Sequence, residues 1–74
     1  MNLPVIDPLA TGKNIKHFAK DHKYTAKGVA TMCSVTRTSV YKWYSGDNVP
    51  TVDNLIILSN LFGVKIDDLV VVRR

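Results

Sequence analysis

The chain has 74 residues, of which ten are Lys or Arg and six are Asp or Glu, for a net charge of +4. This length allows one domain at most and leaves little room for a catalytic cleft beside the core. The one cysteine, Cys33, excludes an internal disulfide and fits a reducing compartment. No apolar run approaches the roughly 18 residues that cross a bilayer, and the first residues lack the features of a signal peptide. We therefore expect a cytoplasmic protein with no membrane partner.

The positive charge is concentrated in one part of the chain. Residues 9–46 contain seven Lys or Arg and one acid, Asp21, for a balance of +6, whereas residues 47–74 contain three bases and four acids, for a balance of −1. A basic part beside a nearly neutral one suggests a polyanionic partner. The alternative is a lysine-rich surface that only keeps the protein soluble.

The prolines at positions 4 and 8 predict an extended N-terminal arm over residues 1–10, followed by a domain over residues 11–72. Thr11 is a candidate cap for a first helix over residues 12–22. Its apolar residues recur at a helical spacing. They are Ile15, Phe18 and Ala19.

Two short helices are expected next. Thr25 is a natural cap for residues 26–33, and Thr36 caps a third helix that stops at the turn residues after Ser45. Since only Ser34 and Val35 separate the two helices, they must cross at a steep angle. This pattern predicts a helix-turn-helix unit over residues 25–45.

A fourth helix is predicted over residues 52–62, beginning after Pro50 and Thr51 and ending at Gly63. A fifth covers residues 66–70. The tail "VVVRR" is an alternative strand that would pair with "PVI" near the start of the chain. With no alternation of strands and helices, we predict an all-α fold with five helices.

The third helix has an unusual polar face. At 100° per residue five of its polar side chains lie in one arc of roughly 140°, with no acid among them, while Ser39 lies at the edge of the other side. The five are Arg37, Thr38, Tyr41, Lys42 and Ser45. In a helix-turn-helix the second helix lies in the DNA major groove, where an arginine matches the two acceptors of guanine. The alternative is a helix pair that only packs.

Residues 15–69 resemble the phage-repressor and Cro-like helix-turn-helix family, the Cro/C1-type or xenobiotic-response-element family. The run "YTAKGVATMCSVTRTSVYKWYSGDNVPTVDNLIILSNLFGVKIDDL" contains the matching marks. The resemblance implies a compact five-helix lambda-repressor-like domain, usually a transcriptional repressor that binds double-stranded DNA as a homodimer. It places base reading at Arg37, Thr38, Tyr41 and Lys42. Further residues are expected to contact DNA phosphates, either through the exposed amides that begin the second helix or because the resemblance implies it. They are Thr25, Ala26, Lys27, Ser39, Ser45 and Asn48.

The sequence departs from the family pattern in three places. Ala26 stands where a phosphate-gripping Gln is common, and Ser34 stands where the turn often has Gly. The third departure is double: Ala19 and Tyr44 replace an Arg and a Glu that many members bury as a pair. The loss of both charges together makes physical sense, because a single buried charge without its partner would be strongly destabilising. We expect Tyr44 to fill the space beside the small Ala19.

Other chemistry is weakly supported. His17 and His22 are five residues apart, so they do not share the helix face that two metal ligands need. "ATGKN" lacks the earlier glycine and the strand of a phosphate-binding loop. We find no catalytic triad or paired carboxylates, and Cys33 lies among core positions. We therefore expect no enzyme, no metal and no cofactor.

The sequence allows two alternatives for its outer apolar residues and two for its function. Apolar residues beyond the core stripe, namely Ile56, Ile57, Val70 and Val72, indicate either a homodimer surface or extra cover for a small core. The function is either sequence-specific DNA binding by a small regulator, with repression the favoured outcome, or protein binding as an antitoxin or adaptor. A regulatory protein partner fits either hypothesis. RNA binding lacks a platform of paired aromatic residues.

Overall fold

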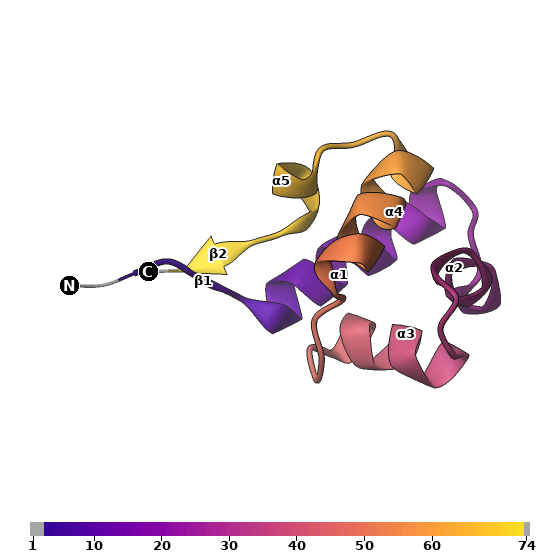
Figure 1. Ribbon diagram of the computed structural model, residues 1–74, viewed down its shortest axis with the longest axis horizontal. Coiled ribbons are helices and arrows are strands. Elements are labelled where there is room, and N and C mark those ends of the chain that lie inside the picture. Colours follow the sequence, from indigo (N-terminus) through magenta and orange to yellow (C-terminus); the bar gives the residue numbers. More distant parts are fainter. Residues whose placement is uncertain (1–2, 74) are drawn as a thin grey trace.

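The computed structural model describes residues 3–73 and shows five helices with a two-stranded ribbon at the chain ends (Figure 1). The predicted five-helix fold is therefore confirmed. In chain order the elements are β1 (Val5–Ile6), α1 (Pro8–Asp21), α2 (Ala26–Cys33), α3 (Arg37–Ser45), α4 (Val52–Phe62), α5 (Ile66–Leu69) and β2 (Val72–Arg73).

The helix starts are set by local hydrogen bonds. The hydroxyl oxygens of Thr25, Thr36 and Thr51 each accept a bond from the backbone N–H three residues later, at 3.0, 3.1 and 3.3 Å. Each bond satisfies one of the donors that a helix leaves free at its N-terminus. The predicted starts of α2, α3 and α4 are therefore correct.

The predicted start of the first helix is wrong. The α1 helix begins at Pro8, and its cap is Asp7, whose carboxylate accepts a bond from the Ala10 N–H at 3.1 Å. Proline suits a first helical position because its missing N–H needs no partner there. Residues 8–10, predicted as part of an extended arm, form the first turn of α1. Thr11 is a fully buried residue inside the helix.

The tail forms the strand that was the alternative prediction. Val5 pairs with Arg73 and Ile6 with Val72 in an antiparallel register. The ribbon is fastened to α1 because the Thr11 hydroxyl accepts a 3.0 Å bond from the Val71 N–H and lies 3.4 Å from the Val71 carbonyl oxygen. The α5 helix ends at Leu69, one residue short of the predicted end.

The core is built by all five helices. Its members, mostly at positions that the apolar spacing predicts, are Ile15, Ala19, Val29, Ala30, Cys33, Val40, Trp43, Leu58, Phe62 and Leu69. Phe18 and Phe62 stack at 6.0 Å between ring centroids, which joins α1 to α4. This core fixes the position and rotation of α3.

A glycine lets α1 approach α3 closely. A Cβ atom built at Gly12 would lie closer than 3.0 Å to the carbonyl oxygen of Trp43 and 3.0 Å from that of Tyr44. Gly46, which ends α3 with φ 83°, makes a similar backbone approach to Leu9. Both positions therefore need the absence of a side chain. The sequence-based interpretation of Gly12 as a helix start missed this role.

Candidate nucleic-acid interface

The turn between α2 and α3 depends on one strained residue. Ser34 adopts the left-handed conformation, with φ 57° and ψ 42°, and the N–H of Val35 bonds back to the carbonyl of Ala30 at 3.0 Å. This geometry ends α2 and places Val35 against the core. A serine therefore occupies a left-handed backbone position that glycine would adopt without steric cost.

The rotation of α3 is fixed from its inner side. Val40 and Trp43 are buried, while the Thr36 hydroxyl accepts a bond from the Ser39 N–H and shares a second with the Ser39 hydroxyl, each at 3.1 Å. A helix anchored at its start and along its inner face presents one invariant outer face. That face can serve as a rigid reading surface.

All four predicted base-reading residues lie on the exposed side of α3, and Ser45 lies there with them. Tyr41 is 57% exposed. In the part of the chain that the structure describes, the one contact of a basic with an acidic side chain joins His17 and Asp21 at 3.2 Å, so Arg37 and Lys42 have no acidic partner there. The face therefore offers two free cations and several hydrogen-bond donors to solvent.

The predicted phosphate-contacting residues are placed unevenly. Thr25 and Lys27 are exposed at the start of α2, and Ala26 is half-buried beside them. Ser39 is half-buried, and its hydroxyl is hydrogen-bonded to that of Thr36. The Ser45 hydroxyl donates to the Lys42 carbonyl at 3.2 Å. The last member, Asn48, is exposed in the loop after α3.

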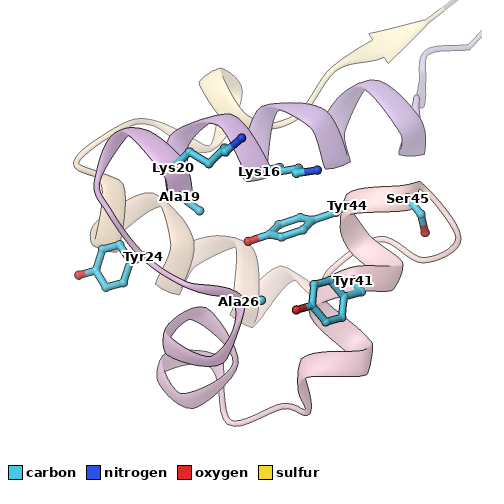
Figure 2. Close-up of a pocket in the computed structure, with 8 residues that line it drawn as sticks. All are labelled: Lys16, Ala19, Lys20, Tyr24, Ala26, Tyr41, Tyr44 and Ser45. Carbon is cyan, nitrogen blue, oxygen red and sulfur yellow. The ribbon is translucent and has the colours of Figure 1, made fainter.

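A hollow of about 450 Å³ lies between α1, the start of α2 and the C-terminal half of α3 (Figure 2). Its lining consists of Lys16, Ala19, Lys20, Tyr24, Ala26, Tyr41, Tyr44 and Ser45. Tyr41 and Tyr44 extend from α3 toward the start of α2, and the lysine side chains run along α1. Tyr44 does reach the space beside Ala19, but it leaves this hollow open.

Burial controls the chemistry of two groups near the hollow. It raises the pKa of the Tyr44 phenol, with smaller contributions from Tyr41 and Cys33. Burial likewise raises the pKa of the Cys33 thiol. Both groups are therefore protonated near neutral pH, so Tyr44 is a hydrogen-bond donor and Cys33 a poor nucleophile.

The predicted dimer surface is divided between two environments. Ile56 and Val72 are 44% and 50% exposed, whereas Ile57 and Val70 pack against the core. Val52, which was not singled out from the sequence, is 69% exposed one turn before Ile56 on α4. The spacing of these two residues would have identified the pair as one outer face.

Other site types find little support in the described residues. Within residues 3–73 no group of three His, Cys, Asp or Glu side chains is arranged to hold a metal ion. None of the helices in that range is long and apolar enough to cross a bilayer.

The capped helix pair, its tight turn and the exposed cationic face of α3 define a helix-turn-helix DNA-binding domain. The chain belongs to the Cro/C1-type helix-turn-helix family, whose model matches residues 15–69. This is a family of DNA-binding transcriptional regulators.

Two curated relatives share this domain. The chain is 34% identical over 64 residues to the HTH-type transcriptional activator BcrR of Enterococcus faecalis, covering 86% of this chain and 27% of that protein. It is 34% identical over 53 residues to the regulator DicA of Escherichia coli K12, covering 72% of this chain and 39% of that protein. The chain thus spans about a third of the length of these relatives.

A solved structure gives the same result. A transcriptional regulator from Listeria innocua superposes with a TM-score of 0.77 at 28% identity, over 81% of this chain and 56% of that one. Sequence and backbone comparisons therefore identify the same family.

Proposed function

We propose that this domain binds duplex DNA in a sequence-specific manner and acts as a small transcriptional regulator that represses by occupying its site. The observation that supports it is the exposed outer face of α3, which is held rigidly by the buried Val40 and Trp43. A preorganised face loses little conformational entropy when it enters the major groove.

The proposed base contacts follow from side-chain chemistry. Arg37, at the first position of α3, suits the O6 and N7 acceptors of guanine. Thr38 offers a hydroxyl and a methyl group, and the latter suits the methyl of thymine. Tyr41 and Lys42 lie one turn later, where a side chain reaches either a base edge or the backbone.

The proposed phosphate contacts surround this face. The first amides of α2, at Ala26 and Lys27, are free to bind a phosphate oxygen, with the helix dipole behind them. Thr25 and Lys27 on one side, and Ser45 and Asn48 on the other, are exposed for backbone contacts. Ser39 completes the proposed set if its hydroxyl gives up its hydrogen bond to Thr36 and bonds to a phosphate oxygen instead.

We further propose that the domain acts as a homodimer through its exposed apolar residues Ile56 and Val72, with Ile57 and Val70 supporting them from the core side. Two recognition helices on one DNA face would then read half-sites about 34 Å apart. Footprinting would show two protected half-sites in phase with the helical repeat. A single or out-of-phase footprint would contradict the dimer.

The test of DNA binding compares Arg37→Ala with Lys65→Ala, which removes one positive charge from an exposed position between α4 and α5. Duplexes enriched from a random pool by the wild-type protein, and unselected duplexes, would be titrated at two salt concentrations. We expect Arg37→Ala to lose about 1–3 kcal/mol of the free-energy difference between binding selected and unselected duplexes, whereas Lys65→Ala keeps that difference.

Three other results have distinct meanings. Equal binding to all duplexes that collapses with salt would show backbone contacts alone. Equal losses in the two variants would mean that Arg37 contributes only charge. No binding at low salt would overturn the proposal and favour the second candidate function, protein binding. The observation that favours that candidate is the exposed apolar pair Val52 and Ile56 on α4.

A further inference from the structure

The hollow between α1 and α3 has cations and donors but no acid. Lys16 and Lys20 lie on its α1 side, and the lining contains no Asp or Glu. Among residues 3–73 neither lysine forms an ion pair. The hydroxyls of Tyr24, Tyr41 and Tyr44 make no hydrogen bond within that range. A site with positive charge and unpaired donors favours a ligand that is negatively charged and rich in acceptors.

The walls of the hollow are flat and apolar. Tyr41 and Tyr44 meet edge to face, with centroids 6.4 Å apart and ring planes at 76°, so they form two sides of a corner. The small side chains of Ala19 and Ala26 leave the remaining space open (Figure 2). Its volume of about 450 Å³ lies within the roughly 300–1,000 Å³ of small-molecule sites. A bare oxyanion would leave these ring faces without contacts.

We propose that this hollow binds a small organic anion, in which a flat apolar group lies against Tyr41 and Tyr44 and a carboxylate or phosphate meets Lys16 and Lys20. The site goes beyond the proposed DNA binding and stands without it. Tyr41 belongs to both the hollow and the outer face of α3, so the ligand and a base pair would compete for one side chain.

The experiment uses the whole chain without DNA and follows backbone amide shifts by NMR. The probes are 1-naphthoate, its neutral analogue 1-naphthalenemethanol, and inorganic phosphate. We expect naphthoate to shift the amides around Ala19, Ala26 and Tyr44 with a Kd of about 1 mM, the range set by the efficiency of small ligands. The alcohol and inorganic phosphate should each bind at least about fivefold more weakly, because each lacks one of the two contacts.

Variants separate the site from general attraction to a basic protein. The double change Lys16→Gln and Lys20→Gln should weaken naphthoate binding about fivefold or more, because it removes both exposed cations. Lys65→Gln, which removes a charge elsewhere, should leave binding unchanged. Ala26→Leu should block the hollow, and a thermal melt would verify that this variant is folded.

Each opposing result overturns the proposal. Equal binding of the alcohol would show that no anion is recognised. Equal binding of inorganic phosphate would show a bare oxyanion site of the kind that a DNA backbone fills. Shifts that spread over α4 and α5, or survive the double lysine change, would place the ligand elsewhere. With DNA present, naphthoate should weaken DNA binding severalfold, and an unchanged affinity would refute the sharing of Tyr41.

Discussion

Replacing Gly12 by alanine tests whether the close approach of α1 to α3 holds the fold together. Helix propensity alone predicts stabilisation by about 1 kcal/mol, because glycine is a poor residue inside a helix. The structure predicts the opposite. The new methyl group would overlap the Trp43 carbonyl oxygen and touch that of Tyr44. These are backbone atoms, so no side chain can rotate to make room.

The size of the loss follows from overpacking. Forcing a methyl group into a tight contact costs about 1–3 kcal/mol, and more where the neighbour is backbone, so we expect a net loss of about 2–4 kcal/mol. A domain of 74 residues is stabilised by roughly 4–11 kcal/mol in total. The melting temperature should fall by about 8–32 °C, since each kcal/mol shifts it by about 4–8 °C at this size.

Gly28→Ala is the matched control, because Gly28 also lies inside a helix. A Cβ atom there would be 3.4 Å from the Thr25 hydroxyl oxygen and 3.6 Å from Tyr24, which are ordinary contacts. We expect this variant to gain about 0.5–1 kcal/mol. Urea unfolding followed by circular dichroism would measure both. A Gly12→Ala protein as stable as the wild type would refute the packing argument.

Three further changes test other parts of the structure. Ser34→Gly should raise the free energy of unfolding by about 0.5–1 kcal/mol in a urea titration, because glycine relieves the left-handed strain; a loss would contradict this. Thr11→Val should cost about 1–3 kcal/mol by the same assay, because it leaves the part-buried Val71 N–H unpaired; no loss would mean that another acceptor replaces the hydroxyl. Stability should fall as the pH rises above about 9, because Cys33 and Tyr44, with ordinary pKa values of 9.0 and 10.0, ionise more readily when unfolded. Melts of Cys33→Ala and Tyr44→Phe between pH 7 and 11 should show a smaller alkaline loss, and curves parallel to the wild type would contradict the assignment.

The elements that local interactions determine were predictable from the sequence. Thr25, Thr36 and Thr51 each bond an N–H three residues away, so the starts of α2, α3 and α4 could be predicted from short stretches. The exposed face of α3 was predictable for the same reason, since the helical period and a few apolar residues decide which side is buried.

The errors came from contacts between distant segments. Thr11 has the chemistry of a helix cap, but its hydroxyl bonds to Val71, which is 60 positions away in the chain. Gly12 resembled a helix start because its closeness to Trp43 depends on how α1 and α3 pack. The joint presence of Ala19 and Tyr44 indicated an altered space between these helices. It did not reveal that Tyr44 leaves that space partly open.

The pairing of β1 with β2 has a consequence for how the domain can be attached to other segments. Both ends of the described chain leave the helices side by side at this ribbon, away from α3 (Figure 1). A segment fused at either end would therefore begin at a single point and leave the exposed face of α3 clear. A pulling force applied through such a fused segment would first load the β1–β2 ribbon and its hydrogen bonds to Thr11, and only then α2 and α3. The attachment point of any neighbouring segment is therefore separated from the exposed face of α3.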